Sequence, residues 1–162
     1  ILVTVDEALI QPVCDAIKSQ LSVLPRAEIT AQALTHSRII LMKDKNEVMD
    51  FINYYAPEHL IIQTKDYEKL AEKVENAGSV FMGPFTPESA GDYASGTNHT
   101  LPTNGYAHAY SGVNLDSFIK KITFQEITSE GISKLGPTIQ IMAENEQLEA
   151  HRNAVTVRLK TL

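Results

Sequence analysis

The chain has 162 residues, of which 43% are hydrophobic, and it carries a formal net charge of −6. This length allows one domain with an appendage and a real hydrophobic core. The net negative charge and the absence of any cluster of Lys or Arg argue against nucleic acid or an anionic membrane as a partner. No apolar run of about 18 residues occurs, so we expect no membrane span.

The single cysteine, Cys14, excludes an internal disulfide and a CxxC metal site. This is in keeping with a reducing, cytoplasmic location, and the position of Cys14 in an apolar helix pattern predicts a buried side chain. The chain begins with Ile and opens directly as a strand, from which we expect a piece of a longer chain.

The first third of the sequence alternates predicted strands and helices. Residues 1–5 read as a strand, and apolar residues at spacings near 3.6 predict a helix from Asp6, its expected cap, to Pro25. Pro12 lies about one turn inside, where it either kinks this helix or marks its true first turn. A short helix at 28–34 and a buried strand at 37–42 follow.

The alternation continues with helix 44–55, strand 60–63, helix 66–76 and strand 79–82. Short apolar strands that alternate with helices imply an α/β domain with a mostly parallel sheet covered on both faces. We therefore expect an α/β domain over residues 1–113.

The sequence changes character after residue 114. Residues 115–127 predict a short helix and a strand, 128–142 a helix interrupted by Gly136-Pro137, and 144–162 a final helix. Two helices with little sheet context need another surface on which to bury their apolar faces. Residues 114–162 are therefore predicted to form a mainly helical arm.

The segment from Gly83 to Thr103, GPFTPESAGDYASGTNHTLPT, gathers glycines and prolines around Asp92 and His99. Proline fixes φ and glycine permits positive φ, so we expect one specific, non-repeating path that aims polar side chains at a point. This site loop follows the last clear strand, and ligands of open α/β sheets bind beyond the carboxyl ends of strands. The alternative is a plain connection in which Asp92, Thr97 and Asn98 hydrogen-bond their own backbone, and local composition alone favours it.

No two of the five histidines have the spacing of an HExxH zinc site, so a metal site would have to join distant segments. The pair Glu58-His59, between a helix and a buried strand, is suited to proton transfer. Asp92 and His99 could bind a divalent metal or a polar substrate. The alternatives are a loop histidine beside a solvated glutamate and a loop without a ligand.

Glu146 and His151 lie about 140° apart around the predicted final helix and cannot form a local two-ligand site. A solvated helical face is the alternative for this pair. We assign His36 and His108 structural roles. Neither GxGxxG nor GxxxxGK[ST] occurs, so the residues that would bind a nucleotide cofactor are unknown.

Three segments, in this order and separation, closely resemble the histidinol dehydrogenases: APEHL at 56–60, the site loop at 83–103 and LEAHRNAVTVRL at 148–159. The resemblance covers essentially the whole chain. It implies the C-terminal portion of an enzyme that oxidises L-histidinol to L-histidine through an aldehyde, with reduction of two NAD and one zinc per site. The α/β part would then belong to an incomplete Rossmann-like domain.

The resemblance also implies roles for individual residues. His59 resembles the base that removes the alcohol proton, and Glu58 the group that activates water for hydration of the aldehyde. Asp92 and His151 resemble zinc ligands that also touch substrate, and His59, His99 and Glu146 would bind substrate. Two other functions remain as alternatives. One is a dimerisation or scaffold module without activity, and the other is a zinc-dependent hydrolase that uses Glu58 to activate water.

The family has two further zinc ligands in a QxxH motif that does not occur in this sequence. Because zinc usually takes about four ligands, we expect this fragment alone to be inactive. The family is also a homodimer in which the C-terminal arm crosses to the partner. The resemblance therefore implies that Glu146 and His151 complete the partner's site.

Overall fold

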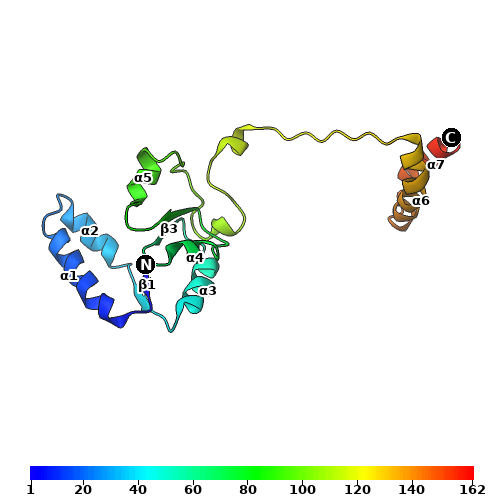
Figure 1. Cartoon of the computed structure of the whole chain (residues 1–162). Coiled ribbons are helices and arrows are strands. Elements are labelled where there is room, and N and C mark those ends of the chain that lie inside the picture. Colours follow the sequence, from blue (N-terminus) through cyan, green and yellow to red (C-terminus); the bar gives the residue numbers. More distant parts are fainter. The chain divides into compact units, whose positions relative to one another are not determined.

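The computed structural model describes residues 1–162, which form two compact units, unit 1 at 1–119 and unit 2 at 120–162. The boundary expected at residue 113 lies inside unit 1. Figure 1 shows the order of the elements along the chain. No helix combines the length and the apolar character that a bilayer crossing requires.

Unit 1 contains two pairs of short parallel strands. β1 (Leu2–Thr4) pairs with β2 (Ile39–Leu41), and β3 (His59–Ile62) pairs with β4 (Ser79–Met82). Parallel neighbours need a crossover, which α1 (Ile10–Leu21) with α2 (Ala27–Leu34) supplies for the first pair and α4 (Tyr67–Ala71) for the second. α3 (Lys45–Tyr55) joins the two pairs. The prediction of an α/β fold with parallel strands is confirmed, but the strands form two sheets, not one.

Local capping signals explain where the first helices begin. The Asp6 side chain accepts a hydrogen bond from Ala8 N at 3.0 Å and caps a short 3-10 helix at Glu7–Leu9. α1 then starts at Ile10, so Pro12 lies in its first turn, where the missing N–H costs nothing. The alternative of a kink is wrong. Cys14 is half-buried, not buried as predicted.

The core of unit 1 lies on one face of the β3–β4 pair. Leu60 and Ile62, alternate residues of β3, pack with Met49 of α3 and Leu70 of α4. Lys45 Nζ also lies 2.6 Å from both carboxylate oxygens of Asp66, just before α4. This hydrogen bond lowers the pKa of Asp66 below its ordinary value.

Asn53 ties α3 to the segment that leads into β4. Its side chain donates to Lys73 O at 2.9 Å and accepts from Glu75 N at 2.8 Å. The side chain of Asn76 donates back to Asn53 O at 3.0 Å. These bonds hold residues 73–76, which were predicted to continue a helix but lie beyond the end of α4.

Residues 83–119 contain more helix than predicted. α5 (Glu88–Tyr93) lies inside the segment expected to be non-repeating, so that expectation is wrong for these residues. Two short 3-10 helices follow, at Tyr106–His108 and at Leu115–Phe118. The second agrees with the short helix predicted at the start of residues 115–127.

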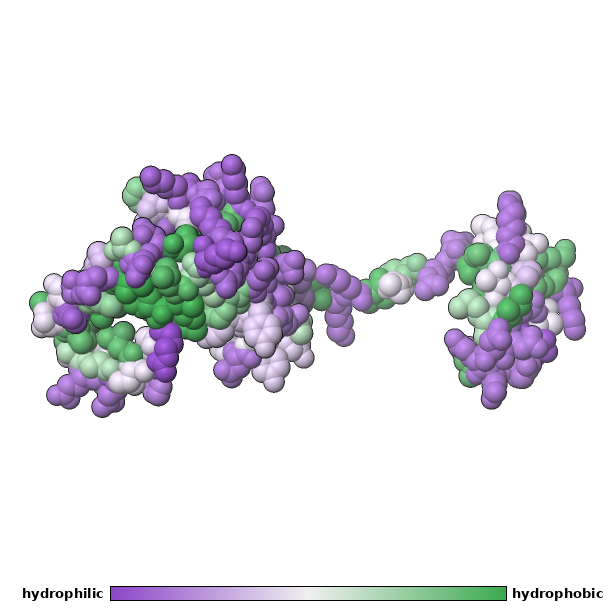
Figure 2. Space-filling view, turned by 90° about the horizontal axis from the view of Figure 1, so that it is seen from below, coloured by the Kyte–Doolittle hydropathy of each residue, from purple (hydrophilic) through white to green (hydrophobic).

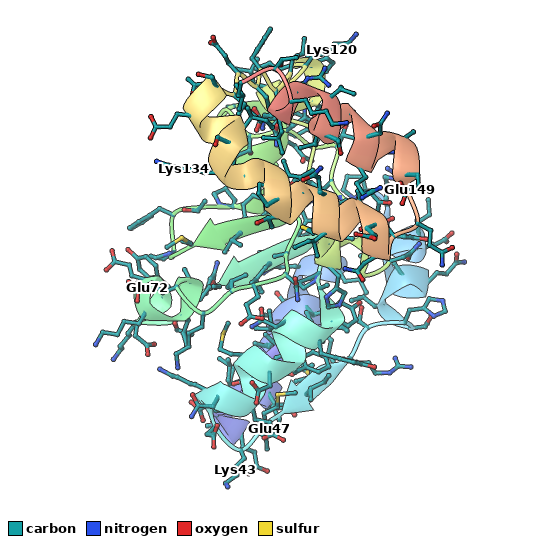
Figure 3. All side chains as sticks on the ribbon, turned by 90° about the vertical axis from the view of Figure 1, so that its right-hand side faces the viewer. Lys43, Glu47, Glu72, Lys120, Lys134 and Glu149 are labelled. Atoms are coloured by element: carbon teal, nitrogen blue, oxygen red, sulfur yellow. The ribbon has the colours of Figure 1, made fainter.

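Unit 2 is a pair of packed helices, α6 (Ser129–Asn145) and α7 (Glu149–Leu159). α6 runs through Pro137 without a break, so the predicted interruption is wrong, and no strand forms over 115–127. A Cβ on Gly136 would lie 2.9 Å from Leu159 Cδ1, which shows how closely the helices approach. Figure 3 labels Lys134 on α6 and Glu149 on α7.

Unit 1 leaves much apolar surface uncovered. Figure 2 shows hydrophobic residues gathered on one face of this unit. Leu9, Ile17 and Leu24, on the predicted apolar face of the first helix, are 42%, 38% and 45% exposed.

Candidate functional site

Three side chains of unit 1 converge from distant parts of the sequence. A ring nitrogen of His59 and one carboxylate oxygen from each of Glu88 and Asp92 all lie within 4.8 Å of one another. His59 Nε2 is 3.6 Å from Glu88 Oε1. All three residues are half-buried, so they are held by packing and remain reachable from solvent. We call them the His59 cluster.

The strands place His59 on the face opposite the core. His59 is the first residue of β3, and side chains alternate along a strand, so His59 points away from Leu60 and the core. Phe81, in the middle of β4, lies on the same side, with its ring centroid 5.9 Å from that of His59. The buried phenyl ring therefore supports the imidazole from one side.

Gly91 brings α5 against this face. A Cβ at Gly91 would lie 2.6 Å from Phe81 Cε1 and 3.2 Å from Thr97 Oγ1, which is too close for any side chain. Thr97 Oγ1 donates to Gly91 O at 3.1 Å and holds the segment after the helix. Gly91 is thus required by close approach, and this contact sets the distance of the α5 carboxylates from His59.

Glu88 and Asp92 are four residues apart in α5, so both carboxylates lie on one side of the helix. The sequence reasoning found Asp92 but missed Glu88. In the segment ESAGD, the two acidic residues are four positions apart, which would place them on one side of a helix. The surrounding glycines and prolines predicted a loop instead, so this spacing was not taken into account.

The structure does not bring Glu58 into the cluster. Glu58 precedes His59, and its side chain forms no hydrogen bond or ion pair. Its backbone O accepts from Ser79 N at 2.9 Å, and a Cβ on Gly78 would approach this oxygen to 2.5 Å. The close passage of Gly78 therefore fixes the backbone that leads into His59.

His99 also lies outside the cluster and is exposed. The neighbouring Asn98 Oδ1 accepts from Thr100 N at 2.7 Å, so this part of the site loop bonds its own backbone, as the plain-connection alternative describes. Glu146 and His151 belong to unit 2, and both are exposed. Glu146 ends α6 and His151 lies in the first turn of α7.

The position of the cluster differs from the expectation. The sequence predicted a site beyond the carboxyl ends of the strands, whereas His59 lies at the amino end of β3 and α5 packs back over the face of the pair. A separate cleft of about 780 Å³ is lined by residues that include Ser79, Thr97, Asn98 and Tyr110. No member of the His59 cluster lines it.

The His59 cluster offers one imidazole nitrogen and two carboxylate oxygens. These are the ligand types of zinc and other divalent transition metals. They are equally the parts of a proton-transfer site, in which an imidazole accepts a proton and a carboxylate orients the ring. The geometry therefore supports either metal binding or general-base chemistry on a bound polar molecule.

Comparisons with known proteins agree on one family. The sequence model of histidinol dehydrogenase matches residues 1–159. The chain is 62% identical over 161 residues to "Histidinol dehydrogenase" of Bacteroides thetaiotaomicron, covering 99% of the chain and 38% of that protein. It is 53% identical to the chloroplastic histidinol dehydrogenase of Arabidopsis thaliana, covering 100% of the chain and 35% of the relative.

A solved structure agrees in fold. The crystal structure of histidinol dehydrogenase from Elizabethkingia anophelis is 56% identical, with a TM-score of 0.92, and covers 99% of this chain and 37% of that one. The chain therefore spans less than two fifths of the length of each of these relatives.

Proposed function

The chain belongs to the histidinol dehydrogenase family, and from this we propose that the full-length protein oxidises L-histidinol to L-histidine through an aldehyde, with reduction of two NAD and with zinc in its site. The parallel strands and helical crossovers of unit 1 are in keeping with part of a Rossmann-like domain.

The observation that carries the proposal is the approach of His59 to Asp92. The resemblance assigns both residues to one substrate, and their ligand atoms lie within 4.8 Å although they come from β3 and α5. Loss of hydride from an alcohol carbon requires a group that takes the hydroxyl proton. We assign that role to His59, which is half-buried against Phe81.

Two oxidations at one carbon need water to enter between them, because the aldehyde must be hydrated before it loses a second hydride. We assign activation of this water to Glu58. Its carboxylate has no competing partner, and the backbone bond from Ser79 N holds its main chain. Glu146 and His99, both exposed, would contact substrate.

Asp92 and His151 would hold zinc. The Asp92 carboxylate belongs to the His59 cluster, and the His151 imidazole is exposed without a side-chain hydrogen bond, so both are available as ligands. Bound zinc would clamp the imidazole and amine of the substrate and so orient it. Two ligands do not hold zinc tightly, so we expect the 162-residue chain alone to be inactive.

We further propose a homodimer in which unit 2 of one subunit completes the site of its partner. In favour of this, unit 2 keeps large apolar side chains exposed on its helices, for example Ile141 and Met142 at 60% each. Such residues need another surface to cover them.

Mixing two defective chains tests this exchange. In a heterodimer of Asp92→Ala and His151→Ala full-length chains, exchange places both defects in one site and leaves the other site intact. We expect each homodimer to be inactive and the heterodimer to recover activity in one of its two sites. The measurement is histidinol-dependent NADH formation by heterodimers purified with two different tags.

The matched control is a heterodimer in which both substitutions are in the same chain, paired with a wild-type chain. With exchange, each of its sites then carries one defect, and activity is lost. Recovery in this control but not in the first heterodimer would contradict the exchange.

A further inference from the structure

We propose that Glu88 is the positioning carboxylate of His59, a role that rests on the function proposed above. The inference follows from the juxtaposition of the His59 ring with both the Glu88 carboxylate and the Phe81 ring. Glu88 touches neither substrate nor cofactor in this account and acts through His59.

The contacts of the imidazole carry the proposal. Glu88 Oε1 lies 3.6 Å from His59 Nε2, and the two side chains are 39% and 30% exposed. The ring of Phe81 lies at 5.9 Å between centroids and 33° between planes, which restricts tilting of the imidazole. Phe81 itself is only 4% exposed, so its ring is buried on the face of the β3–β4 pair that carries His59.

Glu58, the neighbour in sequence, is not placed for this role. Glu58 lies just before β3, and its carboxylate is not part of the His59 cluster. Glu58 makes no ion pair, whereas His59 pairs with Glu88 from a helix 29 residues further along the chain (88 − 59). The carboxylate that pairs with His59 is therefore that of Glu88 and not that of its neighbour in sequence.

Orientation by a carboxylate determines which ring nitrogen is free. With Nε2–H directed at Glu88, Nδ1 keeps its lone pair and takes the hydroxyl proton of the substrate. The oxidised nicotinamide, when bound, would accept the electron pair of the C–H bond as hydride, so that the C–O bond becomes a carbonyl. The distance of 3.6 Å would shorten to about 2.8 Å on binding, as catalytic hydrogen bonds do.

Glu88 has two other roles that the test must separate. It is the first residue of α5, where a negative charge stabilises the helix start. It also lies in the His59 cluster, where it could be a metal ligand. If Glu88 only stabilises the helix start, any carboxylate at this position should serve. If Glu88 is a metal ligand, its removal should lower the zinc content. If Glu88 positions His59, the side chain must be long enough for its carboxylate to reach His59 Nε2.

The experiment compares Glu88→Ala, Glu88→Asp and wild type in the zinc-loaded full-length protein, with Glu72→Ala as matched control. Glu72 is an exposed glutamate without a partner, just beyond α4 (Figure 3). We expect Glu88→Ala to lower kcat by about 10- to 100-fold, with KM for histidinol and zinc per chain unchanged. Glu88→Asp keeps the charge but is one methylene too short, so kcat stays low.

The tautomer of His59 gives a readout that does not depend on turnover. In protein labelled with ¹⁵N-histidine, we expect the ring of His59 to carry its proton on Nε2 in wild type and to divide between both nitrogens in Glu88→Ala. If wild type does not oxidise histidinol, the proposed function fails, and this measurement still decides whether Glu88 orients His59.

Three results would overturn the proposal. Zinc lost together with activity in Glu88→Ala would make Glu88 a ligand. Full kcat in Glu88→Asp with an unstable Glu88→Ala would leave only the helix-start role. An unchanged kcat and tautomer in Glu88→Ala would remove any role for Glu88 at His59.

Discussion

Replacing His59 by Ala in the full-length protein is expected to lower kcat for histidinol oxidation by about 10³-fold or more, while the affinity for histidinol stays largely unchanged. A positioned base contributes roughly 10²- to 10⁴-fold to such a step, and no other imidazole lies in the cluster to replace it. The measurement is steady-state NADH formation, with histidinol binding followed by calorimetry.

His36→Ala is the matched control, because His36 is exposed and lies outside the cluster. It should leave kcat unchanged. Near-normal turnover of His59→Ala would remove His59 as the base. A large loss of zinc in the same variant would instead place His59 among the metal ligands.

Gly91→Val is expected to lower kcat by about 10²-fold, although Gly91 bears no functional group. The new Cβ would lie 2.6 Å from Phe81 Cε1, so α5 or the buried ring must move. Displacing a catalytic group by about 1 Å can lower the rate of the reaction by on the order of 10²-fold. The loss arises because Glu88 and Asp92 move away from His59.

Ser89→Val places the same side chain on the same helix at an exposed position and should retain activity. A crystal structure of the Gly91→Val protein would show a longer separation between α5 and His59. Full activity of this variant would contradict the view that close packing of α5 on Phe81 sets the site.

Elements with strong local signals were predicted well from the sequence. α3 begins after Asp44, whose side chain accepts from Asn46 N at 2.9 Å. It ends at Tyr55, and Ala56, which follows, is in the left-handed region with φ of 51°. β4 spans the predicted residues 79–82. In both cases the apolar pattern and the flanking residues act within a few positions of each other.

Elements that depend on distant contacts were not predicted. α5 is only six residues long and is stabilised where Gly91 meets Phe81, a contact between segments ten residues apart (91 − 81). α6 continues through Pro137, and the adjoining Gly136 lies close to Leu159 and Val155 of α7. Short-range propensity carries no information on either contact.

The site residues divide in the same way, between those recognised from local motifs and those that depend on contacts between distant segments. His59 and Asp92 were found because they fall in motifs of the family, and the structure brings them together. Glu88 was missed because its role depends on α5 being a helix and on the fold of α5 over β3 and β4. His99, Glu146 and His151 remain predictions.

The most direct test of the central claim is histidinol-dependent NADH formation by the full-length protein, with zinc and after chelation, beside the 162-residue chain. We predict zinc-dependent oxidation by the full-length protein and none by the 162-residue chain. No oxidation by a folded, zinc-loaded full-length protein would contradict the account, and hydrolysis without NAD would point to Glu58 as the water activator of a hydrolase.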